Sequence, residues 1–286
     1  MRPDDLAALV IKGLMDRNPK LIPEAIDEVI FGAANQAGED NRNVARMALL
    51  LAGLPVEIPG STINRLCASG MDAVASVARG IRAGDYEVAI AGGVESMSRA
   101  PFIMPKADTA FSRGNQIFDT TIGWRFINPK MEACFGVDTM PETADNVASE
   151  YNVARADQDA FALRSQQRWA AADAAGIFVN EILPVHIEQR GSGTIVIDRD
   201  EHPRPETNLD KLDKLDKLTT RMKGREEDFR ATLREMEHKA KKREFTDQEN
   251  AAAKKDLASI QEELDAEEDF SDVQAGNTSV SIRILN

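Results

Sequence analysis

The 286-residue sequence predicts an α/β protein built from a layered α/β domain, an inserted loop lobe and a charged helical tail. In residues 1–98, helix-period apolar patterns alternate three times with short strand-like runs, as in a domain with a largely parallel sheet. Residues 99–208 contain many prolines and longer loops, and residues 209–286 are strongly charged. We therefore expect three parts with these boundaries.

Local patterns predict each element of the first part. Asp4 or Asp5 can cap a helix whose apolar positions run from Leu6 to Met15 and which ends near Asn18. Short apolar runs bounded by charged residues or glycine predict buried strands, and Ala-rich or amphipathic stretches predict helices. The elements expected after the first helix are a strand at 29–31, a helix at 43–51, a strand at 61–63, a helix at 71–81 and a strand at 88–91.

The lobe of residues 99–208 is expected to hold a long helix over 156–175, a shorter one after 141–143 and a strand at 194–197. An insertion of this size is a common place to build a substrate cleft. In the tail, an Asp-Lys-Leu triplet is repeated over 210–218, and its period of three fits neither an α-helix nor a coiled coil, so we interpret it as a seam. Two amphipathic stretches beyond it predict a helical hairpin or an oligomeric coiled coil, and 279–285 alternates like a strand.

The bulk composition narrows the function classes. A net charge of −13 argues against broad attraction to nucleic acid or to an anionic membrane. No stretch reaches the length of a membrane span, and residues 1–5 do not resemble a secretory signal, so we expect a cytoplasmic protein. Cys67 and Cys134 are too few for a disulfide framework.

Cys67 is the candidate catalytic residue. It stands where a strand that ends near Arg65 turns into a helix that starts near residues 68–70. Backbone N–H groups and the positive end of the helix dipole at such a position favour the thiolate, which is the nucleophilic form. The small residues at 68–70 leave room for an acyl group and its carrier. The alternative is a buried thiol that only fills space.

Five segments around and after Cys67 resemble the signatures of thiolases, in the order and spacing of that family: 64–70, 92–101, 140–146, 154–159 and 200–207. Segments 35–43 and 121–129 are most similar to the 3-oxoadipyl-CoA thiolases, which are acetyl-CoA C-acyltransferases of bacterial aromatic-acid catabolism (the beta-ketoadipate pathway). The resemblance covers residues 1 to about 210, and the tail does not share it. A ketoacyl synthase relative would also place a Cys at a strand-to-helix turn, but segments 93–101 and 200–207 fit thiolases better.

The resemblance implies the N-terminal half of the thiolase fold and a mechanism. Cys67 would attack the 3-oxo carbonyl of an acyl-CoA, release acetyl-CoA and pass its acyl group to a second CoA, so that 3-oxoadipyl-CoA gives succinyl-CoA and acetyl-CoA. Residues 99–208 would cover the CoA. Acyl-CoA and CoA would be substrates, with no permanently bound cofactor and no metal, and the protein would form homo-oligomers.

Other parts of the family's machinery are not matched. Thiolases also use a His in a Gly-His-Pro motif, a second Cys in a Cys-x-Gly motif and an Asn in an Asn-Glu-Ala-Phe motif, all in the second half of the fold, where this chain has its charged tail. We interpret His186, His202 and His238 as structural or solvated residues and Cys134 as a packed residue of the lobe, not as replacements. We therefore expect a weak or inactive enzyme when this chain acts alone; the alternative is a non-catalytic interaction protein that assembles through the helical tail.

The resemblance also makes the fold incomplete at its start. Thiolases open with a strand before an Arg-Thr-Pro motif, and this chain begins after it, at residues 1–5. In the family that strand lies in the middle of the sheet, so we expect two strand edges left unpaired, one of which residues 279–285 could fill.

Overall fold

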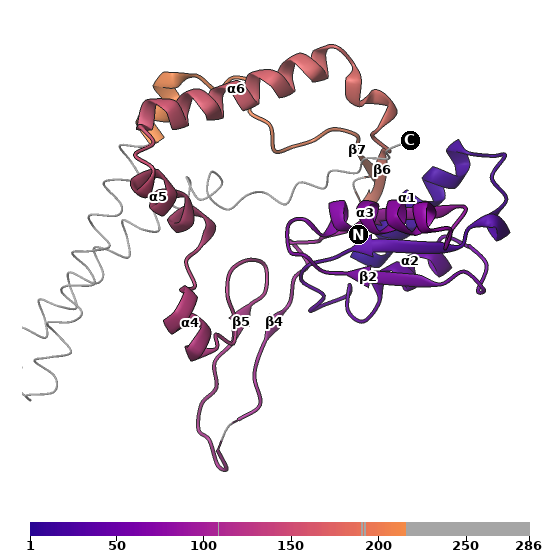
Figure 1. Cartoon of the computed structure of the whole chain (residues 1–286), viewed down its shortest axis with the longest axis horizontal. Coiled ribbons are helices and arrows are strands. Elements are labelled where there is room, and N and C mark those ends of the chain that lie inside the picture. Colours follow the sequence, from indigo (N-terminus) through magenta and orange to yellow (C-terminus); the bar gives the residue numbers. More distant parts are fainter. Residues whose placement is uncertain (108, 190, 192, 216–286) are drawn as a thin grey trace, which may run out of the picture. The chain divides into compact units, whose positions relative to one another are not determined.

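The computed structural model describes residues 1–107, 109–189, 191 and 193–215 (Figure 1). Within this range the chain divides into two compact units. The first comprises residues 1–146 and 178–200, and the second comprises residues 147–177 and 201–215. The boundaries expected at 98 and 208 stay predictions.

A three-stranded parallel sheet forms the centre of the first unit. Strands β1 (Glu28–Gly32), β2 (Gly60–Ile63) and β3 (Ala89–Gly93) have the order β2-β1-β3. In this register Ile30 lies opposite Ser61 of β2 and Ala91 of β3. The predicted strands and their parallel pairing are confirmed. β1 pairs on both sides, and the outer edges of β2 and β3 carry no further strand among the described residues.

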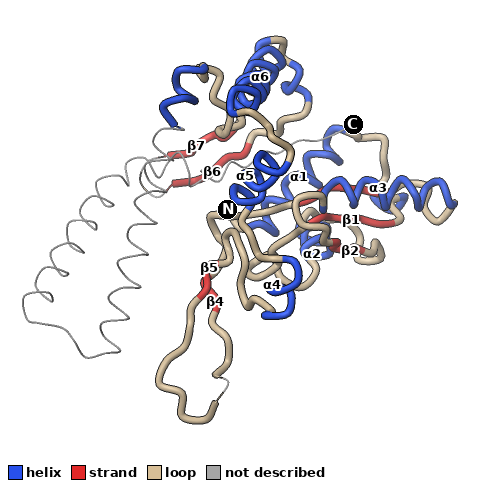
Figure 2. Tube along the Cα trace, turned by 60° about the vertical axis from the view of Figure 1, so that its left-hand side comes forward, coloured by secondary structure: helices blue, strands red, loops and turns tan. Residues whose placement is uncertain are grey.

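Helices cover both faces of this sheet, which makes a three-layer domain (Figure 2). α1 (Pro3–Arg17) and α2 (Val44–Leu51) pack on one face against Val29 and Phe31. α3 (Ser69–Ala83) packs on the other face, where Ile30 contacts Ala73 and Val77. Successive residues of β1 therefore serve opposite cores, as the period of two in a strand requires.

The ends of these helices follow from single residues. Asn43 caps α2, since its side-chain oxygen accepts the Arg46 N–H at 3.2 Å. α3 ends at Gly84, whose φ of +84° lies in the left-handed region that glycine adopts without strain. The prediction that Asp4 or Asp5 caps α1 is wrong: α1 begins at Pro3, so both residues lie inside the helix, and Asp4 instead bonds Arg2.

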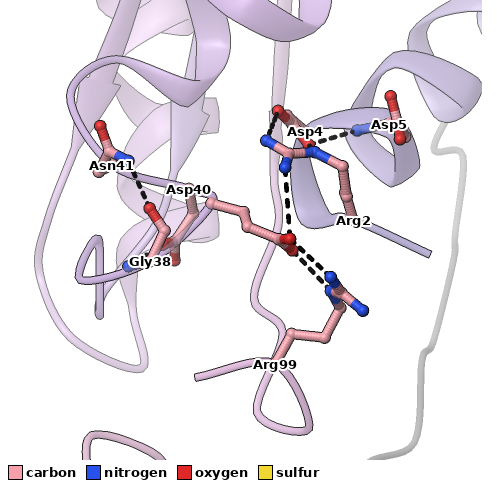
Figure 3. Close-up of polar contacts among 8 residues, drawn as sticks. Arg2, Asp4, Asp5, Gly38, Asp40, Asn41 and Arg99 are labelled. Carbon is pink, nitrogen blue, oxygen red and sulfur yellow. Dashed lines mark hydrogen bonds and ion pairs between the residues drawn. The ribbon is translucent and has the colours of Figure 1, made fainter. Parts of the chain in front are cut away.

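An ion-pair network joins the start of α1 to two loops (Figure 3). Arg2 donates to both carboxylate oxygens of Asp4, at 2.9 and 2.7 Å, and to Glu39 at 3.3 Å. Arg99 donates to both oxygens of Glu39 at 2.6 Å. Asp4 is buried, whereas the arginines are about half exposed. The network therefore connects α1 with the loops after β1 and β3.

This network makes stability sensitive to acid. The hydrogen bond from Arg2 lowers the pKa of Asp4, and that from Arg99 lowers the pKa of Glu39. A carboxylate with a lowered folded-state pKa stabilises the protein above its unfolded pKa, and loses this contribution as the pH falls through the folded pKa. Asp4→Asn should lower the free energy of unfolding by roughly 1–2 kcal/mol at pH 7, and the difference from wild type should shrink below about pH 4.

Urea unfolding at a series of pH values measures this difference. Asp16→Asn is the matched control, because Asp16 forms an exposed ion pair with Lys12 on the same helix, at 2.9 Å. Such a pair contributes less than about 1 kcal/mol. Equal losses in the two variants would contradict a special role for the Asp4 network.

The rest of the chain forms short strands and separate helices. The expected helices near 141 and 156 and the strand at 194 are confirmed as α5 (Met140–Glu150), α6 (Arg155–Ala174) and β7 (Gly193–Ile197). β7 pairs antiparallel with β6 (Val185–Gln189), and this pair packs on α1. The elements not predicted from the sequence are β4 (Phe102–Ile103), β5 (Phe118–Asp119), α4 (Pro129–Phe135) and the 3₁₀ turns Pro23–Ala25 and Ile177–Asn180.

The start of the Asp-Lys-Leu repeat is helical. Residues 209–215 form a helix. The Asn208 side chain caps it by accepting the Lys211 N–H at 2.9 Å. The period of three does not prevent a helix over these residues, because capping and good helix formers outweigh the mismatched period. The interpretation of the repeat as a seam stays a prediction. The predicted hairpin, with His238, and the predicted strand at 279–285 lie outside the described residues. Among the helices that the structure describes, none has the length and apolar character needed to cross a membrane.

Candidate active site

Cys67 lies in the turn between the carboxyl end of β2 and the first residue of α3, Ser69. The predicted strand-to-helix position is therefore confirmed. The Cys67 side chain is exposed, so the alternative of a buried thiol that only fills space is wrong. Whether this thiol is catalytic stays a prediction.

The turn is held by its own side chains. The buried Ser69 hydroxyl accepts the Arg65 N–H at 2.8 Å and donates to the Leu66 carbonyl at 2.6 Å. The Asn64 side-chain oxygen accepts the Leu66 N–H at 2.9 Å. These bonds keep Leu66 at a φ of +49°, a left-handed conformation that is uncommon for a residue other than glycine. Cys67 is thus presented by a strained but closely bonded turn.

The start of α3 rests directly on the backbone of the sheet. A Cβ added at Gly32 of β1 would lie 2.5 Å from the Gly70 nitrogen and 2.6 Å from the Ser69 carbonyl oxygen. A Cβ added at Gly93 of β3 would likewise lie 2.9 Å from the Gly32 carbonyl oxygen. Only glycine permits this approach, so it fixes the height of Cys67 above the strand ends.

Polar residues of three segments meet beside this turn. Glu95 accepts the N–H groups of Ala34 and Asn35, at 2.7 and 3.2 Å. Asn64 donates its side-chain amide to the Ala34 carbonyl at 2.9 Å. The loops after all three strands are therefore bonded to one another at the carboxyl edge of the sheet, where ligands of open α/β sheets bind. Asn64 and Glu95 stand in the motifs quoted above, but sequence reasoning assigned them no role.

The other candidate nucleophiles and bases lie elsewhere. His186 lies exposed on β6, and His202 lies exposed in the second unit. Cys134 lies near the end of α4 and is exposed, so its interpretation as a packed residue is wrong. The letters Cys134-Phe135-Gly136 do form a Cys-x-Gly triplet, within the lobe. In the described part of the first unit no hydrogen bond or ion pair joins His186 or Cys134 to the Cys67 turn. Among the described residues no group of three or more His, Cys, Asp or Glu is arranged to hold a metal ion.

The sequence of this chain is similar to those of known proteins. A family model for the N-terminal domain of thiolase matches residues 1–221. A beta-ketoadipyl-CoA thiolase of Pseudomonas putida is 64% identical over 212 residues, which are 74% of this chain and 53% of that protein. A 3-oxoadipyl-CoA/3-oxo-5,6-dehydrosuberyl-CoA thiolase of Escherichia coli K12 is 60% identical over the same lengths.

A solved structure is also similar to this chain. The crystal structure of the Bacillus anthracis acetyl-CoA acetyltransferase superposes with a TM-score of 0.63 at 34% identity, over 74% of this chain and 52% of that one. This chain thus spans about half the length of the curated relatives that it matches. The matched residues include β1 to β3, α3 and the Cys67 turn. The chain belongs to the thiolase family, of which it carries the N-terminal domain.

Proposed function

We propose that Cys67 is the acyl-accepting nucleophile of a thiolase that cleaves a 3-oxoacyl-CoA, with 3-oxoadipyl-CoA as the substrate and succinyl-CoA and acetyl-CoA as products. The observation that carries this proposal is an exposed Cys67 at the start of α3 in a chain 64% identical to a beta-ketoadipyl-CoA thiolase. The thiol lies at the N-terminal end of α3, two residues before Ser69.

The chemistry has two steps. The Cys67 thiolate attacks the 3-oxo carbonyl carbon, and the bond between C2 and C3 breaks. Its electron pair stays on C2 of the departing acetyl-CoA, which takes up a proton, while the acyl group remains on sulfur as a thioester. The thiol of a second CoA then gives up its proton and takes the acyl group, which restores the Cys67 thiolate.

The two proton transfers need an acid and a base. In this chain the Gly-His-Pro and Asn-Glu-Ala-Phe motifs do not occur, and its one Cys-x-Gly triplet, at Cys134, has no bond to the Cys67 turn. We therefore propose that the chain alone accepts an acyl group but turns over slowly, since loss of a catalytic base lowers such rates by several orders of magnitude.

Further parts of the proposal concern binding and assembly. Acyl-CoA and CoA act as substrates and are not permanently bound, residues 99–208 cover the CoA, and the protein works as a homo-oligomer in the cytoplasm. Family membership supports these points.

Mass spectrometry after incubation with acetyl-CoA or 3-oxoadipyl-CoA tests the proposal. We expect an acyl adduct on Cys67 that Cys67→Ala abolishes and Cys134→Ala, which removes the other exposed thiol, leaves unchanged. Rapid turnover by the chain alone would show that the unmatched motifs are not needed. No adduct, together with oligomers that depend on the tail, would instead support the interaction protein considered above.

A further inference from the structure

The substrate proposed above carries a charge at its far end. In 3-oxoadipyl-CoA one carboxyl group of the adipyl chain is joined to CoA, and the other is ionised at neutral pH. The succinyl group left on Cys67 keeps that carboxylate. An enzyme that prefers this substrate to uncharged acyl-CoAs needs a positive group near the nucleophile, because a carboxylate taken out of water without a partner is costly.

Arg125, in the lobe after β5, is such a group. Its Nη2 donates to the Asn35 side-chain oxygen at 2.5 Å. The Asn35 amide nitrogen donates in turn to the Thr120 carbonyl at 2.9 Å, and the Thr120 side chain is 1% exposed. Asn35 is also held through its backbone N–H, which Glu95 accepts. The guanidinium therefore has a fixed anchor.

The same anchor holds the Cys67 turn. The Asn64 side chain donates to the carbonyl of Ala34, the residue next to Asn35. Asn64 begins the turn that presents Cys67, and all these residues belong to the first unit. Arg125 and the Cys67 turn are thus bonded to adjacent residues in the loop that follows β1, which places the guanidinium beside the nucleophile's segment.

The charge of Arg125 is not neutralised by a protein carboxylate. Arg65 pairs with Asp72 at 2.9 Å, and Arg99 pairs with Glu39 at 2.6 Å. Arg125 bonds a neutral amide, and among the described residues no carboxylate lies within 4.0 Å of it. A guanidinium has five N–H donors, and Asn35 accepts one of them. Among the donors that remain, two can bind the two oxygens of a carboxylate.

We propose that Arg125 binds the distal carboxylate of the acyl group and so selects dicarboxylic acyl-CoAs over uncharged ones. This inference rests on the proposed function of Cys67 and adds to it the residue that sets the substrate class. Arginine suits the task better than lysine, since its planar fork matches both oxygens of a carboxylate.

Calorimetric titration of the full chain tests the assignment without acyl transfer. All variants carry Cys67→Ala, so that no covalent adduct forms, and each is titrated with succinyl-CoA and with butyryl-CoA, in which a methyl group replaces the carboxylate. We expect succinyl-CoA to bind about tenfold more tightly, the effect of one hydrogen bond between charged groups. Adding Arg125→Gln should remove this preference, so that the two ligands bind with equal affinity.

Arg113→Gln is the matched control, because Arg113 is an exposed arginine of the same lobe. It should keep the preference, and circular dichroism should show that all variants are folded. A preference for succinyl-CoA that survives Arg125→Gln would overturn the assignment. The assignment would also be overturned if the Cys67→Ala chain showed no such preference or bound neither ligand. The adduct experiment on the unaltered chain is independent of this result, so failure of the Cys67 proposal is recognised separately.

Discussion

Gly32→Ala is expected to destabilise the layered domain by about 3 kcal/mol or more, at the upper end of overpacking effects. The added methyl group would lie 2.5 Å from the Gly70 nitrogen and 2.6 Å from the Ser69 oxygen. Both are backbone atoms, which cannot move aside by a change of rotamer, so α3 as a whole must shift. The midpoint of urea unfolding measures the loss, and the rate of Cys67 alkylation reports the displaced turn.

Gly70→Ala is the matched control for this substitution. Gly70 lies in the first turn of α3, and no atom lies within 4 Å of a Cβ added there. Because alanine is favoured over glycine in a helix by about 1 kcal/mol, this variant should be as stable as the wild type or more stable. A neutral Gly32→Ala would show that α3 does not approach β1 as closely as the structure has it.

Leu49→Ala is expected to lower the free energy of unfolding by about 2–5 kcal/mol. Leu49 lies on α2, is 0% exposed and packs in the core that α1 and α2 form with the sheet. Its truncation removes apolar contacts and leaves a cavity in this core. Thermal or urea unfolding followed by circular dichroism gives the difference.

Leu51→Ala, two residues further along the same helix, is the control. Leu51 is 56% exposed, so its truncation should change stability by less than about 0.5 kcal/mol. Similar losses in the two variants would mean that α2 does not bury the face that the structure assigns to it.

The layered domain could be predicted because its signals are local. Apolar spacing and flanking glycines specify β1, α2, β2, α3 and β3 within short windows, and the position of Cys67 between β2 and α3 follows from them. β4 and β5 have two residues each, too few to show an alternating pattern. The start of α1 was mispredicted for another reason: Asp4 forms an ion pair with Arg2, outside the local pattern that marks a cap.

The surroundings of Cys67 were predictable only in part. The bonds of Asn35 to Thr120 and Arg125 join residues 85 and 90 positions apart, and nothing in either segment marks the other as its partner. Burial was also misjudged for Cys134, because a free Cys is usually buried and only the tertiary structure shows the exposed end of α4. The sequence patterns therefore did not predict the long-range hydrogen bonds or the solvent exposure of these side chains.

The glycine contact beneath α3 has a consequence for how this protein can change over evolutionary time. Because the start of α3 lies on strand backbone and not on a layer of side chains, substitutions in the surrounding core cannot easily raise, lower or tilt the Cys67 turn. Arg125, which we propose as the partner of the distal carboxylate, comes from a different segment, the loop after β5. New acyl preferences can therefore be acquired in that segment while the reactive sulfur keeps its place.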